Sequence, residues 1–199
     1  MTGLPRFYPI FDEAAWLRRL LPLGVGLVQL RIKELTGAAL RAEIAAARAR
    51  ARAHGAILVV NDHWQEAVDL GCDWVHLGQE DLDTADIPAI RRAGIRLGLS
   101  THDHAELDRA LSFAPDYVAL GPVYPTILKQ MKWHEQGLDK LTEWKRLIGA
   151  IPLVAIGGMS VERAAGAFEA GADVVSAVTD ITLNADPEAR VRQWLEATA

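Results

Sequence analysis

The sequence has 199 residues, and half of them are apolar, which is enough to bury a sizeable core. We therefore expect one compact domain spanning residues 1–199. The formal net charge of -5 argues against nucleic acid or an acidic membrane surface as a partner, so any anion site has to come from a local cluster of basic side chains.

Local features of the chain exclude further classes of protein. Cys72 is the single cysteine, which rules out an intrachain disulfide and a metal site made of several cysteines, and we expect it to act as a small buried apolar residue. The first residues lack the apolar run of a signal peptide, and no stretch has the uncharged length of a membrane span. A soluble, cytoplasmic protein is therefore expected.

Strand and helix patterns alternate along the chain. Hydrophobic periodicity and turn residues predict, in order, strand 7–11, helix 13–21, strand 28–33, helix 36–54, strand 56–60, helix 63–70, strand 74–79, helix 86–93, strand 96–100, helix 103–113, strand 117–123, an irregular segment at 124–137, helix 138–148, strand 152–156, helix 160–170, strand 174–178 and helix 186–196. Thr36, Ser160 and Asp186 are the expected N-caps of their helices.

Eight strands that alternate with eight helices predict an α/β protein built as a single (β/α)8 TIM barrel. The competing architecture is an open, doubly wound sheet. We disfavour it because the glycines of this chain do not form a G-x-G-x-x-G motif at the start of the first helix.

The predicted strand at 28–33 carries an unusual polar face. Val28, Leu30 and Ile32 alternate with Gln29, Arg31 and Lys33, a pattern typical of a β-strand (residues 28–33). In a parallel sheet that is buried on both faces, two buried cations need an anion, most simply phosphate or pyrophosphate. The alternative is that these polar side chains merely reach solvent at the end of the strand.

Polar side chains also follow the other predicted strands, and in a parallel barrel all of them meet at one rim. The candidates there are Gln29, Arg31, Lys33, Asn61, Asp62, Gln79, Asp81, Ser100, Thr126, Lys129, Gly157, Gly158 and Thr179. Taken singly, each has a structural alternative as a helix cap or a turn residue. Together they predict a Mg²⁺ site at the carboxylates, a cationic site for diphosphate, and a second anion site where the glycine pair begins the next helix. We expect His76, in mid-strand, to be a hydrogen-bonded interior histidine.

Several motifs in this order resemble the thiamine phosphate synthase family over nearly the whole chain. They are Gln29-Leu30-Arg31-Ile32-Lys33, Asn61-Asp62, Val75-His76-Leu77-Gly78-Gln79-Glu80-Asp81, Gly98-Leu99-Ser100, Gly121-Pro122-Val123-Tyr124-Pro125-Thr126 with Lys129, and Ala155-Ile156-Gly157-Gly158. The resemblance implies a (β/α)8 enzyme that joins 4-amino-2-methylpyrimidin-5-ylmethyl diphosphate to a thiazole phosphate, giving thiamine phosphate and pyrophosphate. It implies departure of pyrophosphate before attack by the thiazole nitrogen, so no strong protein base is required.

The resemblance also implies roles for individual residues. Arg31, Lys33, Asn61 and Lys129 would hold the diphosphate, Asp62 and Asp81 would bind Mg²⁺, and Gln29 and Ser100 would face the pyrimidine; Thr126, Gly158, Val178 and Thr179 would receive the thiazole phosphate. Arg31, Lys33, Lys129 and Ser100 are the expected catalytic residues. The implied partners are small-molecule substrates, and the family often forms homo-oligomers.

The chain departs from the family pattern near the thiazole site. Ile127-Leu128 precedes Lys129 where a Thr is usual, the run 132–135 is bulkier than expected, and Thr179-Asp180 stands where Ser-Ala is commoner. Two alternatives therefore stay open: a thiazole tautomerase, which would have no use for Asp62, Asp81 and Lys129 together, and a barrel that binds a phosphate ligand without catalysis.

Overall fold

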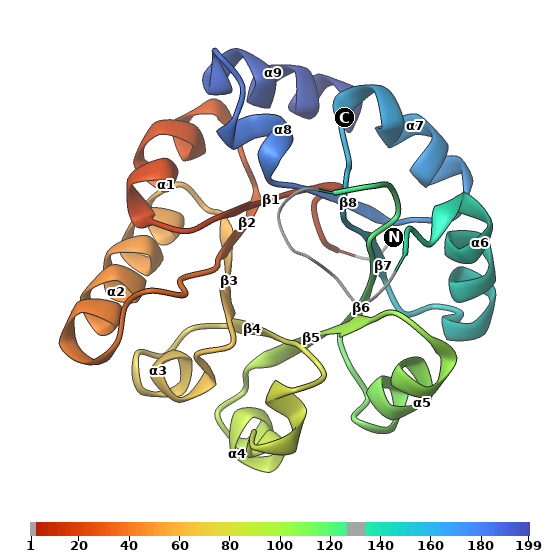
Figure 1. Ribbon diagram of the computed structural model, residues 1–199. Helices are drawn as coiled ribbons and strands as arrows, with labels where there is room; N and C mark the ends of the chain where they lie inside the picture. Colours follow the sequence, from red (N-terminus) through yellow and green to blue (C-terminus); the bar gives the residue numbers. More distant parts are fainter. Residues whose placement is uncertain (1–2, 127–133) are drawn as a thin grey trace.

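The computed structural model describes residues 3–126 and 134–199. Its centre is a closed barrel of parallel strands in which each strand pairs with the next one in the sequence and the last pairs with the first (Figure 1). The strands are β1 (Phe7–Phe11), β2 (Leu27–Leu30), β3 (Ile57–Asn61), β4 (Trp74–Leu77), β5 (Arg96–Thr101), β6 (Tyr117–Leu120), β7 (Leu153–Ala155) and β8 (Val174–Ala177). The predicted (β/α)8 barrel is confirmed.

Helices surround the barrel as an outer ring (Figure 1). They are α1 (Ala14–Leu20), α2 (Gly37–Ala53), α3 (Trp64–Asp69), α4 (Ile87–Arg92), α5 (His104–Ser112), α6 (Gly137–Ile148), α7 (Val161–Glu169) and α9 (Pro187–Ala197). The short helix α8 (Thr179–Thr182) lies inside this ring, between α9 and the barrel (Figure 1). Two short 3₁₀ helices at Leu21–Leu23 and Asp81–Asp83 and the four-residue helix α8 were not predicted, because segments so short carry no periodicity.

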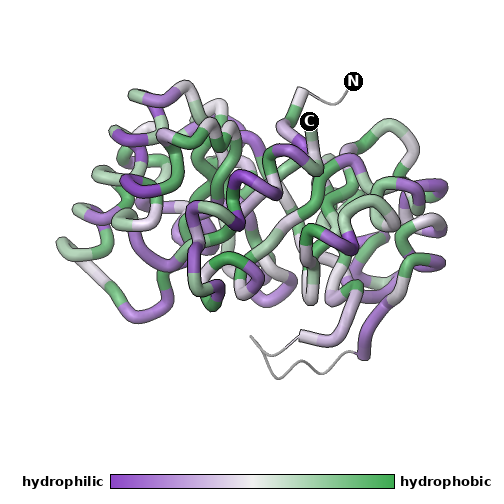
Figure 2. The backbone as a smooth tube through the Cα atoms, turned by 90° about the horizontal axis from the view of Figure 1, so that it is seen from above, coloured by the Kyte–Doolittle hydropathy of each residue, from purple (hydrophilic) through white to green (hydrophobic). Residues whose placement is uncertain are grey.

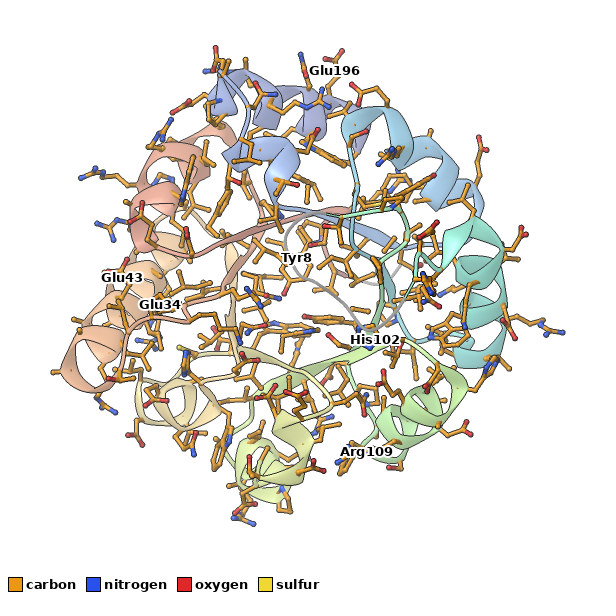
Figure 3. All side chains as sticks on the ribbon, in the orientation of Figure 1. Tyr8, Glu34, Glu43, His102, Arg109 and Glu196 are labelled. Carbon is orange, nitrogen blue, oxygen red and sulfur yellow. The ribbon has the colours of Figure 1, made fainter. Side chains whose placement is uncertain are left out.

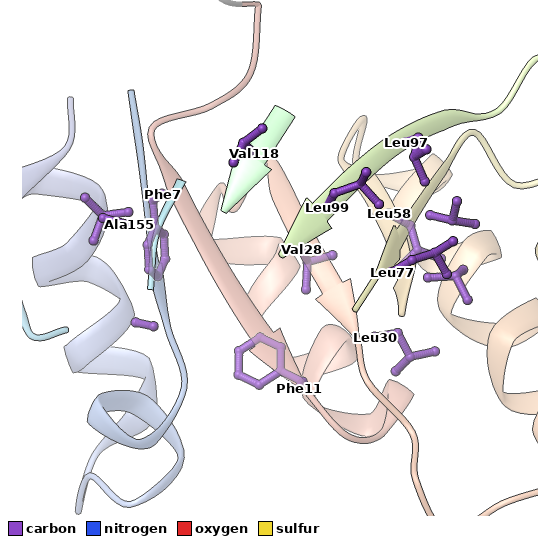
Figure 4. Close-up of a cluster of buried hydrophobic side chains, with 14 of the residues drawn as sticks. Phe7, Phe11, Val28, Leu30, Leu58, Leu77, Leu97, Leu99, Val118 and Ala155 are labelled. Carbon is purple, nitrogen blue, oxygen red and sulfur yellow. The ribbon is translucent and has the colours of Figure 1, made fainter. Parts of the chain in front are cut away.

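Alternation along each strand divides the apolar side chains into two layers. One side faces the helices, as Figure 4 shows for a group that includes Val28, Leu30 and Leu99. The other side fills the barrel with a smaller set, here called the inner cluster: Leu4, Tyr8, Leu27, Val59, Trp74, Tyr117, Ala119, Val154 and Val174. Along the outer helices the backbone alternates between hydrophilic and hydrophobic residues, as expected for helices that pack one face on a barrel (Figure 2).

The strand that contains Gln29 is shorter than predicted. Strand β2 ends at Leu30, the last of its residues that pairs with β1 and with β3, and one further backbone bond joins the Arg31 N–H to Phe11 O at 2.7 Å. Arg31 is therefore half-buried, and the Lys33 side chain is 49% exposed. The expectation of a buried Arg and Lys on a strand face was wrong, because both residues lie in the loop beyond the sheet.

The boundaries of other elements also differ from the predicted ones. Strand β6 ends at Leu120, three residues before the predicted end, because the chain leaves the sheet at Gly121. Thr36 and Ser160 do precede α2 and α7, but neither side chain makes a capping hydrogen bond. Asp186 caps α9 as predicted, since its side chain accepts a hydrogen bond from the Ala189 N–H at 2.9 Å.

Cys72 is buried, as the sequence predicted. Burial raises the pKa of its thiol to about 11. Because the thiolate is the reactive form, we expect a maleimide reagent at pH 7 to modify the native protein about 100-fold more slowly than the guanidinium-denatured protein. Equal rates in the two states would contradict the buried position.

Within residues 3–126 and 134–199, no helix combines the length and the apolar character that crossing a bilayer requires.

Candidate active site

A cavity of about 950 Å³ opens at the carboxyl ends of the strands. In Figure 3, Tyr8 lies inside the ring of strands, whereas Glu43, Arg109 and Glu196 lie among the outer helices. The predicted site residues that line the cavity are Gln29, Arg31, Lys33, Asn61, Asp62, Gln79, Asp81, Ser100, Thr126, Gly157, Gly158, Val178 and Thr179. Lys129, Ile127, Leu128, Lys132 and Trp133 lie outside the described residues.

Two carboxyl groups meet at the mouth of this cavity. Asp62 follows β3, and Asp81 begins the 3₁₀ turn after β4, where its carboxylate accepts a hydrogen bond from the Gly78 N–H at 2.9 Å. Burial raises the pKa of Asp81, and the charge of Asp62 and a hydrogen bond between the two carboxyl groups raise it further. A divalent cation would relieve this repulsion, because it attracts both carboxylates at once.

The backbone at Asp62 is unusual as well. Its φ of 63° lies in the left-handed region, which residues other than glycine rarely adopt, although Asp and Asn tolerate it best. Two backbone bonds hold this conformation: the Asp62 N–H donates to His76 O at 2.9 Å, and the Trp64 N–H donates to Asp62 O at 2.8 Å. Such conformations cluster at functional sites, and here one occurs at a residue that lines the cavity together with Asp81.

Basic side chains stand beside the acidic pair. The Lys33 ammonium donates a hydrogen bond to the Asp62 carboxylate. Arg31 makes no ion pair with any residue that the structure describes, so its guanidinium is available for an anion in the cavity. Asn61, at the last position of β3, is buried and adds a neutral amide to the same wall.

The Gly157-Gly158 turn packs against the loop after β6. A Cβ atom on Gly157 would lie 2.5 Å from Pro122 Cα, and one on Gly158 would lie 2.4 Å from Pro125 O, so neither position has room for a side chain. The turn is not at the start of α7 as predicted, since that helix begins at Val161. The glycine pair lies outside the helix because its φ values of 92° and 63° are left-handed and incompatible with a helical turn.

Helix α8, which the sequence did not predict, brings Thr179 to the cavity. Its next residue, Asp180, accepts hydrogen bonds from Arg190 Nε at 2.8 Å and from Trp194 Nε1 at 2.7 Å, both on α9. Asp180 and Arg190 are mostly buried. This departure from the family pattern therefore anchors α8, and with it the wall formed by Val178 and Thr179.

Sequence reasoning missed two tyrosines at the base of the cavity. His76 is an interior, hydrogen-bonded histidine as predicted, but one of its partners is the Tyr117 hydroxyl at 2.8 Å, and Tyr117 in turn contacts the Tyr8 hydroxyl at 2.9 Å. Gln29 also bonds to Tyr8, at 2.9 Å. The available signal was the alternation along the strands: Tyr8 and Tyr117 occupy positions that face the interior, where a hydroxyl needs a partner.

The model of the thiamine monophosphate synthase family matches residues 8–181. A thiamine-phosphate synthase of Rhizobium etli is 60% identical over 196 residues, which cover 98% of this chain and 96% of that protein. The chain belongs to the thiamine monophosphate synthase family. Its relatives also include a thiamine-phosphate synthase of Neisseria meningitidis serogroup A, 47% identical over 98% of this chain and 97% of that protein.

Solved structures show the same family likeness. A thiamine phosphate pyrophosphorylase from Pyrococcus furiosus superposes with a TM-score of 0.86 at 25% identity, over 97% of this chain and 95% of that one. A 3-hexulose-6-phosphate synthase superposes with a TM-score of 0.70 at 17% identity, over 98% of this chain and 100% of that one. The second likeness shows the barrel fold alone, whereas the first agrees with membership of the thiamine monophosphate synthase family.

Proposed function

We propose that this chain is a Mg²⁺-dependent thiamine phosphate synthase, working as a single barrel domain on small-molecule substrates in the cytoplasm. It would join 4-amino-2-methylpyrimidin-5-ylmethyl diphosphate to a thiazole phosphate and release pyrophosphate. The observation that carries this proposal is that Asp62 and Asp81, whose charges interact, line the same cavity as Arg31 and Lys33. The net charge of -5 supports small anions held locally, without nucleic acid or a membrane as partner. Assembly into homo-oligomers stays a prediction.

The diphosphate would bind at the acidic and basic cluster. Mg²⁺ prefers oxygen ligands and commonly takes one or two carboxylates, with water and phosphate oxygens at its other positions. Asp62 and Asp81 fit this pattern, and no group of three or more His, Cys, Asp or Glu residues gathers for a metal within the described ranges. When bound, the ion would neutralise the leaving diphosphate. Arg31, Lys33, Asn61 and, from the sequence, Lys129 would neutralise or bond the remaining phosphate oxygens.

The second substrate would bind on the opposite wall. Thr126, Gly158, Val178 and Thr179 line this part of the cavity and offer hydroxyl and backbone groups to the thiazole phosphate. Gly158 is suited to this role because a phosphate can approach a backbone that carries no side chain.

The reaction would proceed by departure of the leaving group. The bond between the pyrimidine methylene carbon and its bridging oxygen breaks, pyrophosphate takes the electron pair, and the methylene carbon becomes a cation that the aminopyrimidine stabilises. The thiazole nitrogen then donates its lone pair to form the new carbon–nitrogen bond. The protein supplies neutralising charge, alignment and exclusion of water, which fits a cavity where Arg31 and Lys33 lie beside the two carboxylates proposed to bind the metal.

Pyrophosphate release measured with both substrates tests this proposal. We expect release that needs both substrates, saturates with each, and is abolished by a chelator and restored by excess Mg²⁺. A thiazole tautomerase would convert its thiazole without releasing pyrophosphate, and a non-catalytic barrel would bind ligand without turnover. Either of these results would overturn the proposal.

A further inference from the structure

Five side chains form a continuous hydrogen-bonded chain across the base of the cavity, here called the floor chain. Its members are Gln29, Tyr8, Tyr117, His76 and Ser100, contributed by five different strands. The distances are 2.9 Å from Gln29 Nε2 to Tyr8 Oη, 2.9 Å between the two tyrosine oxygens, 2.8 Å from Tyr117 Oη to His76 Nδ1, and 2.7 Å from His76 Nε2 to Ser100 Oγ. All but Ser100 are buried.

A glycine makes the step from Tyr117 to His76 possible. In register, Gly98 on β5 lies between His76 on β4 and Tyr117 on β6. A Cβ atom on Gly98 would lie 2.0 Å from Tyr117 Cζ and 2.4 Å from its hydroxyl oxygen, so the tyrosine ring occupies the space of the absent side chain. The Tyr117 hydroxyl can therefore pass over β5 and reach His76.

Counting hydrogens gives the floor chain one direction. Gln29 Nε2 donates to the Tyr8 oxygen, so the single Tyr8 hydrogen goes to the Tyr117 oxygen, and the Tyr117 hydrogen goes to His76 Nδ1. Neutral His76 then carries its hydrogen on Nε2 and donates to Ser100 Oγ, which leaves the Ser100 hydrogen for the cavity. Ser176, opposite Tyr8 in register, makes no hydrogen bond with the described residues and does not compete for the Tyr8 hydrogen.

Burial keeps every titratable member of the floor chain neutral. It raises the pKa values of Tyr8 and Tyr117 well above their ordinary value of 10. His76 is buried, and both of its ring nitrogens contact neutral hydroxyl groups, those of Tyr117 and Ser100, so its imidazole has no bonded carboxylate among the described residues to stabilise a positive charge. The hydrogen count above therefore holds at neutral pH.

We infer that Tyr8, Tyr117 and His76 are positioning residues that fix the hydrogen-bond polarity of the cavity base, so that Gln29 accepts and Ser100 donates toward a bound ring. An acceptor and a donor match a heteroaromatic ring that carries an amino group and a ring nitrogen. An oxo group in place of the amino group would set two acceptors face to face at Gln29. This inference rests on the proposed function for the identity of the ring, while the hydrogen count does not depend on it.

The first test measures the tautomer of His76 by ¹⁵N NMR of the full, ligand-free protein. The His76 signals are assigned by their loss in His76→Gln. We expect the Nε2–H tautomer in the wild type and in Tyr8→Phe, which keeps the Tyr117 donor. In Tyr117→Phe the donor to Nδ1 is gone, and both tautomers should be populated. An Nδ1–H tautomer in the wild type, or an unchanged tautomer in Tyr117→Phe, would overturn the inference.

The second test compares two ligands, 4-amino-5-hydroxymethyl-2-methylpyrimidine diphosphate and its 4-oxo analogue. In Tyr117→Phe the Tyr8 hydrogen loses its acceptor and can turn to the Gln29 carbonyl, which flips the amide. We expect the preference for the amino ligand, measured as the ratio of kcat/KM values and of dissociation constants from calorimetry, to fall about tenfold. KM for the thiazole phosphate should not change. An unaltered preference would contradict the inference.

Controls separate this role from a loss of stability or of the proposed activity. Thr198→Val removes one buried hydroxyl that donates to Trp194 O at 2.8 Å, outside the cavity, and should leave both the tautomer and the ligand preference unchanged. If the wild type releases no pyrophosphate, the proposed function fails, yet the tautomer and the binding ratio still decide the inference.

Discussion

Replacing Asp62 with Asn is expected to lower the rate of pyrophosphate release by on the order of 100-fold or more, without unfolding the protein. Asn keeps the size of the side chain and tolerates the left-handed backbone, where φ is 63°, but it carries no charge for a metal. Asp62→Ala should be equally inactive and less stable, because alanine strains that backbone conformation. Steady-state kinetics and thermal unfolding of both variants measure the two effects.

Because Asp81 lies close to Asp62, the Asp62→Asn substitution should also affect the thermal stability of the metal-free protein. Burial and the Asp62 charge both raise the pKa of Asp81, so removing that charge should relieve repulsion in the metal-free protein. We expect metal-free Asp62→Asn to unfold at the same temperature as the wild type or above it. The rise in melting temperature on adding Mg²⁺, which binding to the native state predicts, should disappear.

Asp83 provides the matched control for the acidic pair. It lies in the same short turn as Asp81, two residues later, but its side chain is 69% exposed and pairs with Arg109 at 2.6 Å. Asp83→Asn should retain turnover and the Mg²⁺-dependent shift, whereas Asp81→Asn should lose both. Turnover like that of the wild type in Asp62→Asn would refute the metal-binding role proposed for this residue.

Gly98→Ala is expected to destabilise the protein by about 3 kcal/mol, the upper range for overpacking of a core, and to remove most of its activity. The added methyl would lie 2.0 Å from Tyr117 Cζ. The Tyr117 ring has little room to move, because it is stacked on His76 at an interplanar angle of 13° and bonded to Tyr8. Denaturant unfolding measures the stability, and pyrophosphate release measures the activity.

Two further variants identify the cause of this loss. Gly166→Ala, in helix α7, places its methyl at an ordinary 3.5 Å from Leu138, and it should be neutral or stabilising by up to about 1 kcal/mol. In a Tyr117→Ala background the clash is absent, so the added cost of Gly98→Ala should largely vanish. Additive losses in the double variant would show that the clash with Tyr117 is not the cause.

The sequence predicted the barrel because apolar alternation and helix periodicity depend on local burial alone. It could not place the end of β2, since alternation continues past the last ladder bond: Ile32 is buried although it lies outside the strand. The polar residues Arg31 and Lys33 therefore looked like part of a strand face. A strand ends where its neighbours stop pairing, and this is a property of the assembled sheet.

The sequence also predicted that the candidate residues lie at one rim of the barrel, but it could not predict which of their side chains contact each other. The bond between His76 and Tyr117 depends on the stagger of three strands and on the gap at Gly98, and none of these leaves a local pattern. Likewise, two acidic residues on separate loops were expected at the same rim, while a hydrogen bond between them depends on the left-handed turn at Asp62.

The hydrogen bonds that anchor α8 limit which substitutions this chain can accept at Asp180. Asp180 holds both the Arg190 guanidinium and the Trp194 indole, so changing it alone to the commoner alanine would leave a mostly buried positive charge with one fewer counterion. We therefore expect relatives that carry alanine at this position to differ from this chain at the position of Arg190 as well. We expect the two positions to change together among relatives. Exchanging only one of these two residues between homologues should destabilise the protein, whereas exchanging both should preserve its stability.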